Sequence, residues 1–519
     1  MKRSHGPEDN PRSSCHAMST MHRRQFLQAT AAGALAALTA PRSAWAQMGG
    51  MPGAGLGGMA GLAFAAQSPW TTGLPLRRLP VLANASSVPG EFAAALVASR
   101  YLAPLVPGRA TEFWGYNLAY PGPAIELHEG QRVAIAFGNE LDLDSTIHWH
   151  GLAVPADQDG SPLDPVRPRT GRVYAFDVPA GSAGTYWYHP HAHQTVSLQV
   201  GHGLAAPLIV RSANDPLRAL PELTLMVTSL ALDRNAQVAV GSAAMPGMGA
   251  MTMAGGGALL VNGQRLPVHT AVPGATERWR IVNATADRYL RLGLDGHRFA
   301  VVGTDGGLIG QPLPDLSEWL LAPAQRIEVV VTFDARPSAR FALRDLGYSA
   351  GMMGGAGGEL MTVQTSAAPA LPPVALPATL RPVADPGPAS ARQQVVLSSS
   401  GMGMMTGRFL INGRTFDMDR VDLVSTVGRV ELWDLVNTTF MDHPIHIHGT
   451  QFQVVGRTVR GVAAPVDYAA WLDTVNVPAG ETVTIKIRQA MPGKRMFHCH
   501  ILPHEDAGMM AVLGVHAAA

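Results

Sequence analysis

One pattern occurs three times along the chain and constrains the fold more than any other feature. Each copy has a glycine, an apolar-rich run and an asparagine nine residues after the glycine, and the copies start about 150 residues apart. In the second copy Trp279 and Ile281 alternate with Arg278 and Arg280, which is the period of a half-buried β-strand. The pattern therefore predicts three β-sandwich domains of similar size. The copies span Gly130–Asn139, Gly274–Asn283 and Gly428–Asn437.

Composition favours an all-β fold class and helps to place the domain boundaries. The sequence contains 56 glycines and 40 prolines in 519 residues, which is typical of many turns between short strands. Apolar residues make up 47% and charged residues 15%, which is enough apolar material for packed cores and too little charge for a disordered chain. We expect sandwiches at residues 68–212, 213–366 and 391–519, with a Pro- and Ala-rich linker at 367–390.

The N-terminal residues 1–46 resemble a twin-arginine export signal. Arg23 and Arg24 precede an apolar, alanine-rich run at 29–40, and residues 44–46 supply an A-x-A cleavage pattern. The apolar run is shorter than the roughly 20 residues that a membrane-spanning helix needs, so we expect no membrane anchor after cleavage. These features predict an exported protein that works in the periplasm or elsewhere outside the cytoplasm.

The charge balance and the cysteines limit the partners and the redox state. Lys and Arg total 39 against 38 Asp and Glu, a formal charge of +1, so no basic field is present to hold nucleic acid. The two cysteines are Cys15 and Cys499, and cleavage of the signal would remove the first. A single remaining cysteine cannot belong to a disulfide framework, so Cys499 must be free, intermolecular or metal-bound.

Four H-x-H elements lie in the first and third domains. Residues i and i+2 of an extended strand point to the same face, so each element places two imidazoles side by side. One such pair is often a surface accident, but four pairs in two domains point to metal ligands. At the matching step the middle domain has Leu292-Gly293-Leu294, so it has no ligands there. The elements are His148-Trp149-His150, His189-Pro190-His191, His446-Ile447-His448 and His498-Cys499-His500, and Gly151 and Gly449 follow the first and third.

Cys499 lies between two histidines, so on a strand its sulfur points away from the face that carries them. His443 precedes the third H-x-H element by three residues, while His504 and Met509 follow the cysteine. Two imidazoles, one thiolate and a weak axial thioether form the blue-copper ligand set. Zinc would more often use several cysteines or a closed tetrahedral set. Placement beside histidines disfavours a purely hydrophobic role for Cys499, whereas a core role for Met509 stays open.

Together these motifs resemble the four signature motifs of the three-domain multicopper oxidases, and the chain is most similar to bacterial periplasmic cuprous oxidases and bacterial laccases. The resemblance covers nearly all of the chain after the signal. It implies three consecutive cupredoxin-like Greek-key β-sandwich domains and four copper ions, of which one is type 1, one is type 2 and two are type 3. It further implies His443, Cys499, His504 and Met509 as type 1 ligands, His148 and His446 as type 2 ligands, and His150, His189, His191, His448, His498 and His500 as type 3 ligands.

The resemblance also implies a reaction and its participants. One-electron oxidation of a reductant at the type 1 copper would be coupled, through the Cys499 thiolate, to the four-electron reduction of dioxygen to water. Asp159 and Glu505 stand where the family has acidic residues that carry protons. A purely structural role of Asp159 in the turn-like segment 157–162 stays open. We expect the protein to be a monomer.

The expected substrates follow from departures from the cuprous oxidases. Their Met- and His-rich insertion is reduced here to residues 401–406, and Thr439 stands where an acidic ligand of substrate copper is expected. Met441 keeps a methionine, and Asp442 is a candidate replacement for the acidic ligand. We therefore expect oxidation of small phenolic and aromatic reductants, with Cu(I) oxidation alongside. Gly/Met-rich segments either bring Cu(I) to the type 1 site or are inert loops; they lie at 47–67, 245–253, 352–353 and 402–405.

Two other functions remain compatible with the sequence. One is a dedicated cuprous oxidase for copper tolerance, and the other is a non-enzymatic periplasmic copper-sequestering protein. Copper content without oxygen consumption would favour the second. A scaffold that has lost its copper ligands is disfavoured, because none of the expected ligands is missing.

Overall fold

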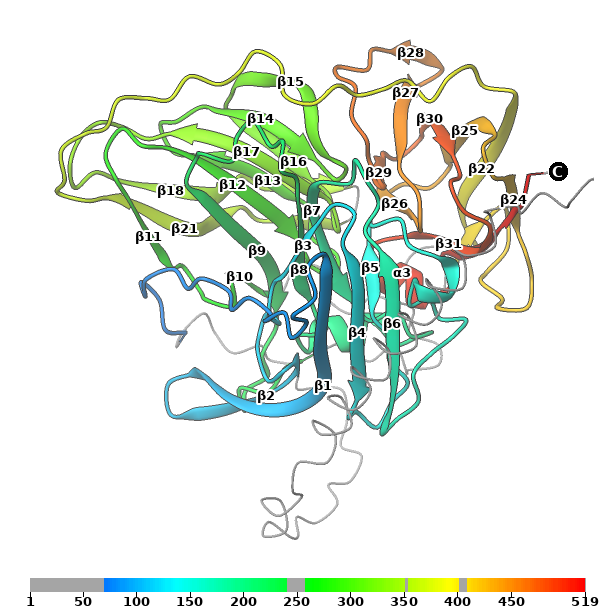
Figure 1. Ribbon diagram of the computed structural model, residues 1–519, viewed down its shortest axis with the longest axis horizontal. Helices are drawn as coiled ribbons and strands as arrows, with labels where there is room; N and C mark the ends of the chain where they lie inside the picture. Colours follow the sequence, from blue (N-terminus) through cyan, green and yellow to red (C-terminus); the bar gives the residue numbers. More distant parts are fainter. Residues whose placement is uncertain (1–69, 240–256, 351–352, 401–407, 519) are drawn as a thin grey trace, which may run out of the picture.

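The computed structural model describes residues 70–239, 257–350, 353–400 and 408–518. Strands dominate this part of the chain, and Figure 1 shows three strand-rich units that follow one another from blue through green to red. The predicted all-β class with three cupredoxin-like domains is confirmed. None of the described helices is long and apolar enough to cross a membrane. The predicted signal at 1–46 and the Gly/Met-rich segments at 47–67, 245–253 and 402–405 lie outside the described residues, as does Met352.

The first domain is a sandwich of two four-stranded sheets whose inner faces share one apolar core. The short helices η1 (Ala156–Gln158) and α2 (Val196–Gly201) follow β5 and β7. One sheet has the order β2 (Arg109–Tyr116), β1 (Glu91–Val106), β4 (Arg132–Asn139) and β6 (Thr170–Asp177). The other has the order β3 (Ile125–His128), β8 (Ala206–Arg211), β7 (Gly184–His189) and β5 (His148–His150).

The second domain packs a six-stranded sheet against a five-stranded sheet and adds the hairpin of β19 (Tyr348–Ala350) and β20 (Met353–Gly355). The six-stranded sheet has the order β10 (Ala258–Val261), β9 (Glu222–Leu230), β12 (Thr276–Asn283), β17 (Arg326–Thr332), β14 (Phe299–Thr304) and β15 (Gly307–Leu316). The five-stranded sheet has the order β11 (Val268–Ala271), β21 (Gly358–Thr365), β18 (Arg340–Asp345), β13 (Leu290–Leu294) and β16 (Glu318–Leu321). The chain then runs from β21 to β22 without helix or strand (Figure 1).

The third domain repeats the arrangement of the second, and the short helix α3 (Leu502–Asp506) follows β31. Its six-stranded sheet has the order β23 (Arg408–Ile411), β22 (Ala391–Ser400), β25 (Val430–Asn437), β30 (Glu481–Arg488), β27 (Phe452–Val459) and β28 (Val462–Ala464). Its five-stranded sheet has the order β24 (Leu423–Thr426), β32 (Met510–His516), β31 (Gly493–Cys499), β26 (His443–Ile447) and β29 (Thr474–Val477).

The repeated asparagine closes the same corner in all three domains. Asn283 donates from Nδ2 to the backbone carbonyls of Arg288 and Leu321, at 2.8 and 2.9 Å, and its Oδ1 accepts the N–H of Thr285. The corresponding bonds are present at the first and third copies. The glycine of each copy has a φ between 69° and 79°, which glycine adopts at little cost. The repeat therefore encodes a turn, a strand and a hydrogen-bonded corner.

Strand β12 departs from the half-buried strand predicted for the second copy, because all of its residues are buried. Arg278 and Arg280 form ion pairs with Glu328 of β17, and Arg280 also donates to Thr185 of β7 in the first domain. Burial disfavours ionisation of Glu328, but the two guanidinium groups lower its pKa to about 2. The second face of β12 is thus covered by another domain, which the alternation of residues along one strand does not reveal.

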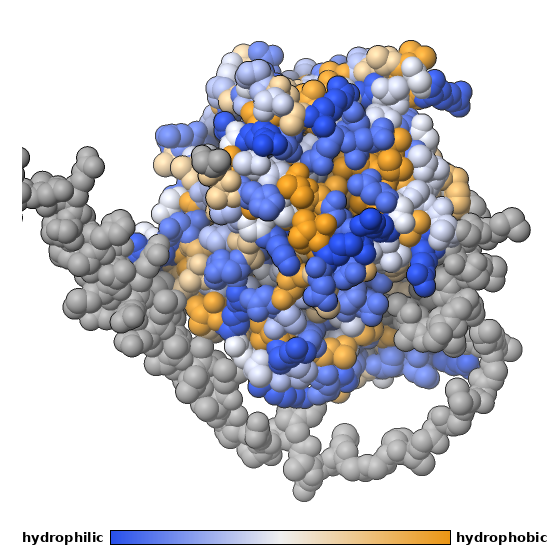
Figure 2. All heavy atoms as spheres, turned by 90° about the vertical axis from the view of Figure 1, so that its right-hand side faces the viewer, coloured by the Kyte–Doolittle hydropathy of each residue, from blue (hydrophilic) through white to orange (hydrophobic). Residues whose placement is uncertain are grey.

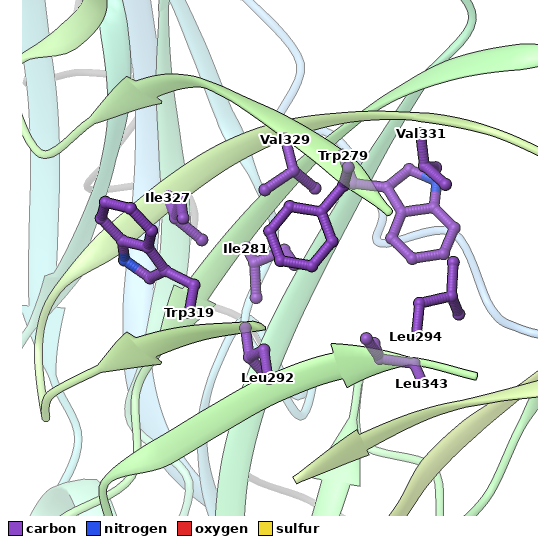
Figure 3. Close-up of a pocket in the computed structure, with 10 residues that line it drawn as sticks. Trp279, Ile281, Leu292, Leu294, Trp319, Ile327, Val329, Val331 and Leu343 are labelled. Carbon is purple, nitrogen blue, oxygen red and sulfur yellow. The ribbon is translucent and has the colours of Figure 1, made fainter. Parts of the chain in front are cut away.

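Apolar packing replaces metal ligands in the middle domain. By strand pairing, Leu292 and Leu294 of β13 match Ile445 and Ile447 of β26, and the position of His446 falls at Gly293. Both leucines line a cavity of about 10 Å³ beside Trp279 and Val329 (Figure 3). A space of this size holds about one water-sized sphere, and apolar walls keep such a space dry. Among the described residues, the side-chain groups that are suited to hold a metal all belong to the first and third domains.

The first and third domains meet at the helices that follow their histidine elements. Asp506, at the end of α3, accepts hydrogen bonds from the backbone N–H groups of Val196 and Ser197 at the start of α2. Leu502 of α3 packs with Val196 and Val200 in one apolar cluster. This contact holds the chain after His191 against the chain after His500.

We expect Asn283→Ala to lower the free energy of unfolding of the second domain by about 2 to 5 kcal/mol, because two buried carbonyls each lose their donor. Urea denaturation followed by tryptophan fluorescence measures the effect, since Trp279 and Trp319 lie in this domain. Asn214→Ala is the matched control, because Asn214 is exposed, and it should change stability by less than about 0.5 kcal/mol. Equal effects of the two substitutions would contradict the corner role.

Candidate metal centre

Strand pairing brings the H-x-H elements together within each outer domain. In the first domain β5 pairs with β7, so that His148 stands opposite His189. In the third domain β26 pairs with β31, so that His446 stands opposite His498. Each outer domain therefore presents its histidines from two neighbouring strands, as the i, i+2 spacing within each strand allows.

The two sets of histidines meet across the boundary between the first and third domains. His148 Nε2 lies 3.3 Å from His446 Nε2, and this pair joins one residue of each domain. His191 Nε2 and His448 Nε2 each lie 3.1 Å from His498 Nε2. The remaining three rings also gather, with the His500 ring centroid 4.9 Å from that of His150 and 5.3 Å from that of His189. The structure thus gathers eight histidines of the first and third domains into one cluster.

Six of these imidazoles are electrically neutral at neutral pH. Burial lowers the pKa of His446 to about 4. Burial first, and the neighbouring imidazoles second, hold the pKa values of five others well below their usual range; these are His150, His189, His191, His448 and His500. A neutral imidazole keeps a lone pair on one ring nitrogen, which is the form that binds a metal.

The arrangement of ring nitrogens fits a bound metal. His148 and His446 each direct Nδ1 to a backbone carbonyl at 2.9 Å, so Nδ1 carries the proton and the two facing Nε2 atoms carry lone pairs. A cation beside the two Nε2 atoms, which lie 3.3 Å apart, would be bound by one nitrogen from each domain. Buried ring nitrogens of His150, His189 and His500 have no hydrogen-bond partner within the described residues. Metal ligation would satisfy all of them.

A second group lies around Cys499. Its sulfur is 3.5 Å from His443 Nδ1 and 3.8 Å from His504 Nδ1, and all three side chains are buried. The backbone of Met509 bonds to both Cys499 and His504, and its side chain is buried in the same apolar cluster as Cys499. The ring of Phe409 stacks on His504 with centroids 3.8 Å apart. Three members of the predicted ligand set, His443, Cys499 and His504, therefore lie together, and Met509 packs in the same apolar cluster as Cys499.

The Cys499 thiol stays protonated until a cation binds. Burial raises its pKa above the usual range in the metal-free protein. Burial lowers the pKa of His443 to about 3 and that of His504 well below its ordinary value, so both imidazoles are neutral. A soft, thiolate-binding cation would therefore displace the thiol proton and meet two free lone pairs.

The two predicted acidic residues lie beside the histidine cluster. Asp159 Oδ2 accepts a hydrogen bond from His448 Nδ1 at 2.9 Å, and its backbone carbonyl accepts one from His148. Glu505 Oε2 lies 3.0 Å from His498 Nδ1, and its Oε1 lies 3.5 Å from His191 Nδ1. Each carboxylate thus lies next to histidines from both outer domains.

Sequence reasoning missed a third carboxylate at the cluster, Asp473. Its Oδ1 lies 3.0 Å from His150 Nε2, and its backbone carbonyl accepts the Nδ1 proton of His446. Burial opposes ionisation of Asp473, but the guanidinium group of Arg326 more than offsets it and holds the pKa of this carboxyl below its usual range. Asp473 stands 27 residues after His446, and no H-x-H spacing signals it. The sequence signal for this residue was the glycine after each of two H-x-H elements, because a glycine allows side chains from elsewhere in the fold to approach the backbone closely.

The candidate ligands for substrate copper beside His443 are not at the surface. Thr439, Met441 and Asp442 are all buried. The carboxylate of Asp442 accepts hydrogen bonds from Tyr348, Asn476 and the backbone of Ala479. Asp442 is therefore engaged within the protein and does not replace the acidic ligand that is absent at position 439.

Comparisons with known proteins agree with this geometry. Family models described as multicopper oxidase match residues 101–215, 227–367 and 388–518. The multicopper oxidase mco of Staphylococcus haemolyticus is 29% identical over 415 residues, which are 77% of this chain and 83% of that protein. A laccase of Bacillus stratosphericus is 29% identical over 474 residues, with 78% of this chain and 91% of that protein covered.

Solved structures show the same relationship. A multicopper oxidase from Campylobacter jejuni, described as a metallo-oxidase, is 37% identical and superposes with a TM-score of 0.81, covering 88% of this chain and 98% of that one. A laccase-like multi-copper oxidase, CueO, from Ochrobactrum sp. is 27% identical with a TM-score of 0.71, covering 84% of this chain and 99% of that one.

We expect Cys499→Ser to remove the intense visible absorption of copper-loaded protein and about one copper ion per molecule, because a hydroxyl does not replace a soft thiolate. Visible spectroscopy and copper analysis measure the two losses. Far-UV circular dichroism should be unchanged, because serine fits the space of the cysteine. Retention of the absorption in the variant would exclude the sulfur as a ligand.

Proposed function

The chain belongs to the multicopper oxidase family, an oxygen-using class of oxidoreductase, and we propose that it oxidises small phenolic and aromatic reductants and passes the electrons to dioxygen. The observation that carries the proposal is the pairing of a Cys499 group beneath the surface with an eight-histidine cluster that the first and third domains share. We further propose that the protein holds four copper ions and acts as a monomer.

The ligand groups divide among the coppers as follows. His443, Cys499, His504 and Met509 would hold a type 1 copper, and His148 and His446 a type 2 copper. Type 3 copper ions would be held by one triad of His191, His448 and His498 and another of His150, His189 and His500. When bound, copper supplies one-electron chemistry at the cysteine group and the capacity for four-electron reduction of dioxygen at the histidine cluster.

The chain itself connects the two groups. Cys499 contacts His443 and His504 through its sulfur, while its neighbours in sequence, His498 and His500, belong to the two triads. Electrons that enter at the sulfur therefore have a short covalent route along the backbone into the cluster. We take His504, which is 3% exposed and stacks on the ring of Phe409, as the end of this route nearest the reductant.

Reduction of one dioxygen to two waters consumes four protons, so the cluster needs proton carriers. Asp159 holds a hydrogen bond at His448 Nδ1, and Glu505 lies beside His498 Nδ1. We assign both carboxylates to the delivery of protons, Asp159 at Oδ2 and Glu505 at Oε2. Both side chains are buried directly beside histidines of the cluster, so a proton relayed from solvent to either carboxylate reaches the cluster over one hydrogen-bond distance.

The side chains in the loop before His443 favour binding of an organic reductant over binding of a copper ion. Phe440 directly follows Thr439 in the loop before His443, and 45% of its surface is exposed. Met441 and Asp442, the next two residues, are buried. An exposed aromatic ring offers stacking to a phenol and no ligand to Cu(I). Figure 2 shows the face formed by the third domain, where exposed apolar side chains lie among charged ones; those of this domain are Met418, Val421, Val424, Phe440, Val455 and Val462.

Cu(I) oxidation for copper tolerance is the second candidate function. The Campylobacter jejuni relative is described as a metallo-oxidase, whereas the Ochrobactrum relative is described as active toward lignin model compounds. The methionine-rich segments at 245–253 and 402–405 are soft enough to bind Cu(I). With the export signal proposed at 1–46, either activity would take place in the periplasm or elsewhere outside the cytoplasm.

The function is tested by comparing a phenol and Cu(I) as electron donors to copper-loaded protein while oxygen uptake is recorded. We expect a higher kcat/KM for the phenol, and Phe440→Ala should lower it by about 2- to 10-fold through lost ring stacking. Val455→Ala is the control, because Val455 is 43% exposed but lies on β27. Turnover of Cu(I) alone would support the second candidate function, and full copper content without oxygen uptake would indicate copper sequestration.

We expect Asp159→Asn to slow the reoxidation of reduced protein by dioxygen by about 10²-fold and to leave reduction at the cysteine group unchanged, because the amide cannot deliver a proton. Stopped-flow absorption measures the two half-reactions separately. Asp157→Asn is the matched control, since Asp157 is exposed in the same loop. If both half-reactions slowed equally, Asp159 would have only a structural role.

A further inference from the structure

The histidine cluster is flanked by two buried arginine–aspartate pairs. Asp159 lies 3.7 Å from Arg495 Nη1, and both belong to the outer domains. Asp473 is bound by both terminal nitrogens of Arg326, which belongs to β17 of the middle domain. The second pair therefore introduces the middle domain, which has no histidine ligands, into the immediate surroundings of the cluster.

The two aspartates contact the cluster in the same way. The backbone carbonyl of Asp159 accepts the Nδ1 proton of His148, and that of Asp473 accepts the Nδ1 proton of His446, both at 2.9 Å. A backbone carbonyl only accepts, so each contact fixes the ring tautomer and turns Nε2 toward the partner ring. These two rings are the proposed type 2 ligands, and their positions depend on where the two aspartates are held.

Arg326 uses all of its N–H donors, and two of them bind the carboxylate of Asp473. Nη1 donates to Asp473 Oδ1 at 2.9 Å and to the Ala324 carbonyl, and Nη2 bonds Asp473 Oδ2 and the carbonyl of Asp305. Nε donates to the carbonyl of Thr185, in the strand that leads to His189. All five N–H groups are used, and a single buried guanidinium links the middle domain to both outer domains.

The glycines of the H-x-H-G elements leave room for these pairs. A Cβ atom at Gly151 would collide with Asp473 Oδ2 and Arg326 Nη2, and one at Gly449 would collide with the guanidinium group of Arg495. Both glycines also have positive φ. The motif glycine is therefore explained by an arginine that packs against the backbone directly after the ligand pair.

We propose that Arg326 is a positioning residue through which the middle domain sets the geometry of the proposed type 2 pair, by holding Asp473 against His446 and His150. This inference rests on the proposed copper assignment. It gives the middle domain, which has lost its own ligands, a direct part in organising the cluster.

The test compares copper-loaded Arg326→Gln with Arg280→Gln. Arg280 is equally buried in the same sheet and also contacts Thr185, but its carboxylate partners do not touch a histidine of the cluster. In Arg326→Gln we expect an altered hyperfine splitting in the electron paramagnetic resonance signal of the type 2 copper and about 10- to 100-fold faster loss of that copper to a chelator. The visible absorption of the cysteine group should stay unchanged. Arg280→Gln should keep both properties at parent values.

Gly151→Ala provides a second route, because it displaces the Arg326–Asp473 pair without removing a charge, and it should reproduce the altered type 2 signal. Arg326→Lys should recover only part of the parent behaviour, since lysine cannot bind both carboxylate oxygens in a fork. Parent-like type 2 signals and chelator rates in soluble Arg326→Gln or Gly151→Ala would overturn the proposal. A parent protein that binds no type 2 copper would instead refute the copper assignment.

Discussion

The structure depends on buried imidazoles that face one another across a domain boundary. His148 and His446 point their Nε2 atoms at each other over 3.3 Å, and buried nitrogens of His189 and His500 have no partner within the described residues. Such contacts are unfavourable in a protein without metal, because like partial charges repel and unpaired polar atoms are costly to bury. Bound cations would therefore relieve these unfavourable contacts, and they would join the first domain to the third.

Rigid groups around the rings keep this unfavourable arrangement in place. Backbone carbonyls of Asp159 and Asp473 fix two tautomers, and the carboxylates of the same residues reach histidines of the opposite outer domain. The domain contact at Asp506 and α2 fixes the chain just beyond His191 and His500. Because each support comes from a packed element, the ligand atoms do not need to reorganise when metal binds.

The middle domain shows what remains when a domain of this fold has no ligands. Gly293 stands at the position of His446, and Leu292 and Leu294 on either side of it face the apolar core of the domain. The face of this domain that contacts the outer domains carries buried arginines. Arg278 and Arg280 pair with Glu328, and Arg326 binds Asp473. The Arg326–Asp473 pair thus links this domain to the cluster.

Local sequence determined the three sandwiches, the paired imidazoles and the cysteine between them, because strand period and i, i+2 spacing act over a few residues. The repeated asparagine corner at Asn139, Asn283 and Asn437 follows the same logic. Only the tertiary structure decided which residues complete the cluster, since Asp473 and Arg326 reach it from 27 residues beyond His446 and from another domain. It also buried both faces of β12 and enclosed Met441 and Asp442, because domain contacts cover surfaces that the period of a single strand leaves open.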